Sequence, residues 1–294
     1  MSTTVYSTNA ALNATALDLP MPRLVEGRFS ECAAFTDDAL EAACGVRIAF
    51  LERAGGVSAP PYDTLNLGLN VEDDFEDVAA NRRRAARALG AGHASIIQPL
   101  QVHGSRVVTC ASPAEVSSCE REAAAGADAV VVGCDDVAGL LCFADCVPLI
   151  AVSPTGHFAV IHAGWRGVVG GVWRAAIERL SDLDDVDASA LNVYIGPYIH
   201  ACCFEVGPDV RDEFARTFGE GCLAGERHVD MGAALRIGLL DVGVDGRRIA
   251  DVDICTSCEA GMPRPRFFSH RASGGRCGRH GAFAVKVGRG KELV

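Results

Sequence analysis

Residues 127–162 read ADAVVVGCDDVAGLLCFADCVPLIAVSPTGHFAVIH and carry the clearest structural pattern of the chain. Four apolar segments, at 127–132, 138–143, 149–152 and 157–162, are bounded by short polar turns. Short runs rich in Val, Leu, Ile and Phe are typical of buried β-strands. Few helical patterns separate them, so the sequence predicts a sheet-rich core.

The chain on either side of this stretch adds both strands and helices. Strand-like segments lie at 45–52, 95–99, 106–110, 191–195, 248–254 and 283–287, and helical patterns lie at 77–89, 168–180, 208–218 and 231–241. Because they intermingle without a regular βαβ alternation, we predict a mixed-sheet α/β or α+β fold. We expect residues 1–22 to be a disordered or extended tail and residues 23–294 to form a single catalytic domain.

Charge and cysteine content exclude several classes of function. The 294-residue chain has 27 Lys and Arg against 38 Asp and Glu, a formal net charge of −11. No cationic excess is available for a nucleic acid or an anionic membrane, and no apolar run reaches the length of a membrane span. Thirteen cysteines, an odd number, without a signal-peptide pattern predict a reducing, cytoplasmic location.

Three polar residues at strand ends form a candidate metal site. His103 follows the strand predicted at 95–99, Cys146 follows 138–143, and His162 ends 157–162. Two imidazoles and a thiolate suit zinc, and three protein ligands would leave a fourth position for water or substrate. Copper is a less favoured alternative. The spacings of 43 and 16 residues are not specific, and each residue alone is also compatible with an ordinary packing role.

A glycine-rich turn follows His162 and precedes the helix predicted at 168–180. Its backbone N–H groups, the helix N-terminus and the guanidinium of Arg166 would together suit a phosphate. The alternative is that these glycines only permit close packing of the helix on the sheet. We expect Arg166 to bind phosphate.

Two further cysteine pairs have a simpler interpretation. Cys255 and Cys258 form a CxxC, but no second CxxC completes a structural zinc site, and a thioredoxin-like context is missing. Cys202 and Cys203 are adjacent, which is poor geometry for a disulfide between them. We expect Cys255 and Cys258 to pack in the core or in a loop, and the sequence assigns no role to Cys202 and Cys203.

Several strings together resemble one known family. They are YDTLNLGLNVEDD, NRRRAARALG, QVHGSRV, GADAVVV, CFADCVPLIAVSP, VIHAGWRG, IGPYIHACCFEVGPDV and FFSHRASGGRCGR. In this order they are similar to the laccase-domain purine nucleoside phosphorylases, formerly described as multicopper polyphenol oxidases. The resemblance covers 45–287 and is most specific in HAGWRG and ADCVP.

The resemblance implies a fold, a metal site and an activity. It implies one domain of helices layered around mixed β-sheets, with zinc held by His103, Cys146 and His162. It also implies phosphorolysis of adenosine, inosine, guanosine and methylthioadenosine, with adenosine deamination as a second activity. The partners would be a small-molecule nucleoside and phosphate, and zinc would act as a Lewis acid or hold an activated water.

Further site residues follow from the same motifs. Asp145 would orient the zinc site or carry a proton. The resemblance also suggests substrate-binding roles for Asn66, Gln101, Ser269 and Arg271. The chain departs from the family at 271–273, where Arg-Ala-Ser replaces the usual Arg-Arg-Asp, and this change concerns substrate choice more than the metal.

Three other functions compete with a phosphorylase. In a cysteine hydrolase, Cys146 would be the nucleophile, with His162 or His103 as its base and Asp145 nearby. A copper-dependent polyphenol oxidase would need several clustered histidines, whereas the chain has eight scattered ones. A binding module would not need this group of His, Cys, Asp and Arg side chains.

Overall fold

The computed structural model describes residues 18–287 and contains two six-stranded mixed sheets. Sheet A has the order β1 (Val25–Phe29), β2 (Cys32–Thr36), β3 (Val46–Leu51), β14 (His280–Lys286), β7 (Val137–Phe143) and β4 (Ser95–Ile97). Sheet B has the order β13 (Ile249–Asp251), β10 (Asn192–Ile195), β8 (Val147–Val152), β9 (Phe158–Ala163), β6 (Ala129–Val132) and β5 (Val107–Cys110). A short third sheet pairs β11 (Leu223–Ala224) with β12 (His228–Val229).

Eight α-helices connect the strands described. They are α1 (Asp38–Cys44), α2 (Phe75–Ala88), α3 (Val116–Ala124), α4 (Trp165–Val169), α5 (Val172–Asp184), α6 (Pro208–Phe218), α7 (Met231–Asp241) and α8 (Thr256–Glu259). Within residues 18–287, none of these helices has the length and apolar character required to cross a membrane.

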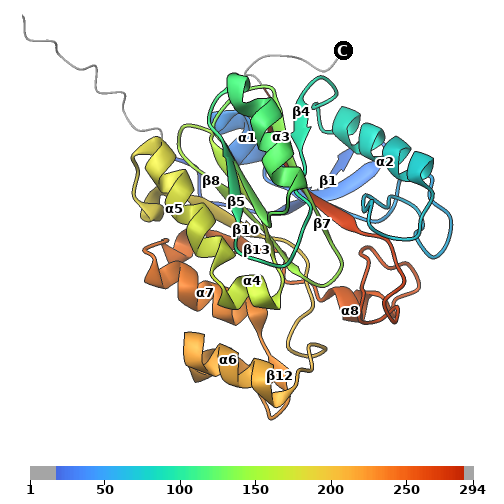
Figure 1. Ribbon diagram of the computed structural model, residues 1–294, viewed down its shortest axis with the longest axis vertical. Coiled ribbons are helices and arrows are strands. Elements are labelled where there is room, and N and C mark those ends of the chain that lie inside the picture. Colours follow the sequence, from blue (N-terminus) through green and yellow to red (C-terminus); the bar gives the residue numbers. More distant parts are fainter. Residues whose placement is uncertain (1–17, 288–294) are drawn as a thin grey trace, which may run out of the picture.

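The two sheets pack face to face between two layers of helices (Figure 1). Alternation along the strands produces this arrangement, because successive side chains of a strand point to opposite faces. In β9, Val160 packs in the apolar layer between the sheets, whereas Ile161 belongs to the apolar cluster on the opposite face, which includes residues of α5 and α7. In β3, Ile48 faces the same inner layer, whereas Ala49 lies on the side of α2. The predicted α/β class, with helices layered around mixed sheets, is confirmed.

Most predicted elements are present, with local differences. The helix predicted at 168–180 is two helices, α4 and α5, because Gly171 adopts φ 75° between them. The sequence analysis did not predict β1, β2, β11, β12, α1, α3 and α8. Helix α1 nevertheless has clear end signals: Asp37 accepts a hydrogen bond from the N–H of Leu40, and Gly45 ends the helix with φ 76°.

The predicted N-terminal tail lies mostly outside the described residues. Within 18–22, Leu19 is buried in the layer between the sheets. The carbonyl of Pro20 accepts a hydrogen bond from the Asn192 side chain, and Asp18 forms an ion pair with Arg248. Residues 18–20 therefore pack against the domain that was predicted to begin at residue 23.

Two loops pass from one sheet to the other at the same end of the molecule. The loop at 98–106 leaves β4 of sheet A and enters β5 of sheet B. The tight turn at 144–146 leaves β7 of sheet A and enters β8 of sheet B. Because β4 and β7 are parallel neighbours, the two crossings lie side by side. The candidate functional site is built on them.

Candidate functional site

His103, Cys146 and His162 converge at this end of the two sheets. His103 lies on the first crossing, Cys146 on the second, and His162 on β9. Their ligand atoms all lie within 4.8 Å of one another, and the two imidazole rings are 4.8 Å apart between centroids. The structure therefore brings together the three residues that the sequence analysis singled out as metal ligands.

Asp128, which the sequence analysis did not single out, holds two of these residues in place. It is completely buried and directly precedes β6. Its carboxylate accepts hydrogen bonds from the backbone N–H groups of Val102, His103 and Gly104, at 3.3, 2.9 and 2.7 Å. It also bonds Nδ1 of His162 at 2.8 Å, which leaves Nε2 of that ring for a ligand. The sequence feature that could have identified Asp128 is its position as a charged residue within the apolar string GADAVVV.

The charges of Cys146, His162 and Asp128 support one another. Burial raises the pKa of the Cys146 thiol, but His162 and hydrogen bonds from both histidines outweigh burial and lower that pKa. Burial lowers the pKa of His162, but the Cys146 thiolate and Asp128 outweigh it and raise that pKa. Burial likewise raises the pKa of Asp128, yet hydrogen bonds from His162 and Gly104 lower it overall. Cys146 is thus held as a thiolate, which is the form that binds metals or attacks electrophiles.

The donor set fits a catalytic zinc centre. Zinc takes thiolate and imidazole ligands in tetrahedral geometry, and catalytic sites use three protein ligands with one open position. The carboxylate of Asp128 bonds His162 and fixes the orientation of its ring, as the carboxylate–histidine pairs of zinc sites do. Two histidines and one cysteine are also a ligand set that copper accepts.

Gly164 provides the space in which the ligands meet. A Cβ at this position would lie 2.8 Å from Cδ2 of His103 and 3.2 Å from Sγ of Cys146. The glycine of the HAGWRG string is therefore required by the packing of the His103 and Cys146 side chains rather than by a turn alone.

We expect Gly164→Ala to lower the metal affinity about 10- to 100-fold, because the added methyl group displaces the ring of His103. Competition with a chelator measures this change. Gly207→Ala is the matched control, since a Cβ there meets no atom within 4 Å. Equal affinities in the two variants would show that the ring tolerates the displacement.

A cavity of about 890 Å³ opens beside the three ligands. Its volume is within the range of small-molecule sites. The predicted residues that line it are His103, Cys146, His162, Asp145, Gln101 and Arg271. Apolar side chains from Leu100, Ile199 and Phe204 and basic side chains from Arg82 and Arg279 complete much of the wall.

The polar groups of Gln101 and Asp145 form hydrogen bonds with other residues of the protein. The Gln101 amide accepts from the N–H of Cys142 at 2.9 Å and donates to its carbonyl at 2.8 Å, which ties the first crossing to β7. Asp145 has φ 90°, and its carboxylate accepts hydrogen bonds from Thr256 Oγ1 at 2.7 Å and from the N–H of Arg271 at 2.6 Å. This arrangement favours a positioning role for Asp145 over that of a proton carrier.

Asn66 and Ser269 are buried and act on the cavity through other residues. The Asn66 side-chain oxygen accepts hydrogen bonds from the N–H groups of Gly68 and Arg279, at 3.0 and 2.8 Å. Ser269 Oγ accepts from the N–H of Ala272 at 3.1 Å and so supports the turn that carries Arg271. Neither Asn66 nor Ser269 is among the residues that line the cavity.

Arg166 lies outside the cavity. It is exposed on the five-residue helix α4, with its guanidinium 4.3 Å from the ring centroid of Trp165. Its predicted phosphate role stays a prediction. Among the described residues, the arginines that line the cavity are Arg82, Arg271 and Arg279.

Comparison with known proteins identifies the family of this chain. Residues 47–286 match the family model described as "multi-copper polyphenol oxidoreductase laccase". The chain belongs to this laccase-domain family. Laccase-domain relatives include one from Geobacillus stearothermophilus, named purine nucleoside phosphorylase YlmD, which is 36% identical over 81% of this chain and 88% of its own. Another, from Deinococcus radiodurans and named purine nucleoside phosphorylase, is 34% identical over 79% of this chain and 85% of its own.

Solved structures of laccase-domain proteins have the same fold. The crystal structure of YlmD from Geobacillus stearothermophilus superposes with a TM-score of 0.79 and 30% identity, and it covers 91% of this chain and 100% of its own. A Neisseria meningitidis protein superposes with a TM-score of 0.72 and 31% identity, over 86% of this chain and 98% of its own.

Proposed function

We propose that this chain is a zinc-dependent purine nucleoside phosphorylase of the cytoplasm. Its substrates would be phosphate and adenosine, inosine, guanosine or methylthioadenosine, with adenosine deamination as a side activity. The observation that carries the proposal is the three-donor centre of His103, Cys146 and His162 at the wall of a cavity that apolar and basic residues also line. The names of the laccase-domain relatives support the same reaction class.

The residues of the cavity suit the requirements of phosphorolysis. A bound zinc ion would supply Lewis-acid chemistry at the open side of its three ligands. Ile199 and Phe204 would contact the flat purine base and exclude water that would otherwise hydrolyse the glycosidic bond. Arg279 would hold phosphate beside the sugar, because a guanidinium bonds two phosphate oxygens at once. Arg271, whose guanidinium donates to the carbonyls of Cys203 and Glu205, would add its positive charge. Asp145 would fix the position of Arg271 through the backbone.

The reaction test uses adenosine with and without phosphate. We expect adenine and ribose 1-phosphate as products, with inosine formed in addition, and we expect base release to require phosphate. Chromatography of the products measures each route. Free ribose formed at the same rate without phosphate would identify a hydrolase, and inosine as the sole product would identify a deaminase.

A pair of arginine variants locates the phosphate. We expect Arg279→Lys to raise the KM for phosphate about 10- to 150-fold, because Lys cannot replace a charge-assisted bidentate bond of about 1.5–3 kcal/mol. Arg166→Lys is the matched comparison, since Arg166 is exposed and outside the cavity. A phosphate titration at saturating adenosine measures both. If the KM for phosphate rose only in Arg166→Lys, the phosphate site would lie at α4 instead.

One observation favours a second candidate, the cysteine hydrolase. Cys146, His162 and Asp128 also have the order of a nucleophile, its base and a carboxylate that orients the base. In this reading the third group is Asp128 rather than the Asp145 of the sequence-based hypothesis. His103 distinguishes the two candidates, because a metal centre needs both imidazoles and a triad needs one.

The copper oxidase is the remaining alternative, and the description of the family names copper. Among residues 18–287, groups of at least three potential His, Cys, Asp or Glu ligands occur twice, and only one of them contains histidine. A polyphenol oxidase with several copper ions would need more clustered imidazoles than this. Copper in the purified protein together with phenol oxidation would favour it over the zinc proposal.

A further inference from the structure

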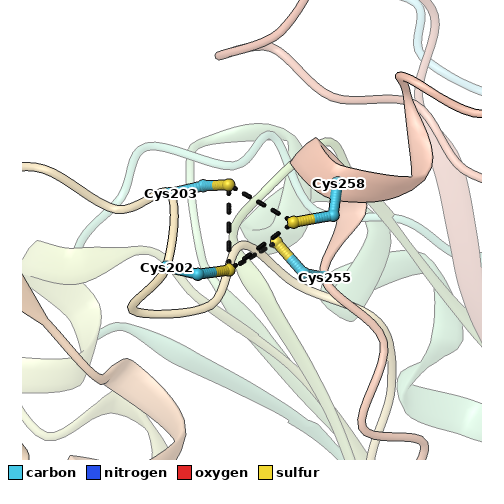
Figure 2. Close-up of side chains that lie close together, drawn as sticks. All are labelled: Cys202, Cys203, Cys255 and Cys258. Atoms are coloured by element: carbon cyan, nitrogen blue, oxygen red, sulfur yellow. Dashed lines mark hydrogen bonds between the residues drawn. The ribbon is translucent and has the colours of Figure 1, made fainter.

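Four cysteine side chains outside the catalytic centre point toward one another, and we call them the four-cysteine cluster (Figure 2). Cys202 and Cys203 lie on the loop after β10, whereas Cys255 precedes α8 and Cys258 lies on it. Sγ of Cys202 lies 3.8 Å from that of Cys203 and 3.7 Å from that of Cys255. Sγ of Cys258 lies 3.6 Å from that of Cys202 and 3.5 Å from that of Cys203.

These separations match sulfur atoms around one tetrahedral ion. Zn–S bonds of about 2.3 Å place two neighbouring sulfurs about 3.8 Å apart. Disulfide-bonded sulfurs would be about 2 Å apart, and all four cysteines are free. We propose that the four-cysteine cluster binds a second, structural zinc ion. Four protein sulfurs complete the coordination, so this ion would have no open position for substrate.

The local backbone presents the cluster as a preformed site. Cys255 is the N-cap of α8, and Cys258 comes three residues later, so both side chains lie on one side of a single helical turn. The N–H of His200 donates to Sγ of Cys255 at 3.4 Å. The adjacent pair at 202–203 supplies the ligands that the CxxC was expected to lack.

The four-cysteine cluster connects two walls of the catalytic cavity. Thr256, next to Cys255, bonds the Asp145 carboxylate, and the N–H of Ile199 donates to the Asp145 carbonyl at 3.0 Å. Arg271 donates to the carbonyl of Cys203 at 2.9 Å and brings a positive charge near the thiolates. An ion in the cluster would therefore fix the loop that carries Ile199 against α8. This role is separate from the reaction proposed above, because none of the four cysteines lines the cavity.

Metal analysis of the full chain, purified under reducing conditions with zinc supplied, tests the proposal. We expect about two zinc ions per wild-type chain, about one in Cys146→Ser, about one in Cys258→Ser and none in the double variant. Cys134→Ser is the matched control, because Cys134 is half-buried and belongs to neither group, and it should keep two. A wild-type chain with one zinc that Cys146→Ser removes completely would overturn the proposal and leave the catalytic site intact.

A second measurement does not depend on the folding of a cluster variant. In Cys146→Ser the four-cysteine cluster is unchanged, so zinc K-edge X-ray absorption should report four sulfur ligands at about 2.3 Å. Nitrogen ligands in that spectrum would overturn the assignment. So would a disulfide between cluster cysteines, detected by mass spectrometry, in wild-type chain purified under the same reducing conditions.

Discussion

The His103→Asn variant is expected to lose its catalytic metal and more than about 10³-fold of kcat/KM for nucleoside and phosphate. This loss exceeds the effect of deleting one hydrogen-bond donor at a reacting centre, because the whole donor set is disrupted. Asn suits this position better than Ala, since residue 103 has φ 58° and Asn tolerates left-handed backbone. Metal analysis and steady-state kinetics on the same preparation measure both losses. Cys146→Ser and His162→Ala should behave alike.

The control for this prediction is His93→Asn. His93 is an exposed histidine that bonds Asp136 away from the cavity, and its replacement should leave metal and rate unchanged. Full activity in His103→Asn with loss in the other two variants would instead support the cysteine hydrolase. A metal centre predicts that all three variants lose activity to a similar extent. The triad of Cys146, His162 and Asp128 predicts instead that His103 is dispensable.

Asp128→Asn is expected to weaken metal binding about 10- to 100-fold and to lower the melting temperature. The metal effect arises because an amide no longer orients the His162 ring through a charged acceptor. The stability effect arises because the carboxylate is buried and accepts hydrogen bonds from three backbone N–H groups. Each hydrogen bond to a charged group contributes about 1.5–3 kcal/mol. Chelator competition and thermal unfolding of the metal-free protein measure the two effects separately.

Asp184→Asn separates a general loss of stability from the effect on the metal. Asp184 is a buried carboxylate that bonds His157 and Thr155, so its pair resembles that of Asp128 and His162. Its replacement should lower the melting temperature without changing metal affinity. If Asp128→Asn changed the melting temperature alone, Asp128 would be a structural residue without influence on the metal.

The sequence was most informative where one residue and its local context suffice. Apolar runs bounded by turns located the central strands, and His103, Cys146 and His162 were recognisable at their ends. Asp128 was missed because its role depends on partners on another loop and on a neighbouring strand. Short elements such as α1 were missed because seven residues give too weak a periodic pattern.

The two cysteine pairs also show that sequence patterns do not reveal contacts between distant segments. Cys255 and Cys258 were recognised as a CxxC, but completing a metal site required a second pair of the same kind in the sequence. The structure supplies a different kind of pair, Cys202 and Cys203, from 53 residues before Cys255. Sequence spacing cannot reveal this match, because the bend after β10 and the position of α8 create it.

The three candidate ligands come from both sheets, and this position has a consequence for how the two sheets are held together. His103 and Cys146 lie where the chain passes between sheets A and B, and His162 belongs to sheet B itself. An ion held by all three would add a cross-link between the two sheets at one end of their shared apolar layer. Because the chain itself joins the sheets at both crossings, removing the ion would loosen the loop at 98–106 rather than separate the sheets, and His103 would lose its fixed position at the wall of the cavity.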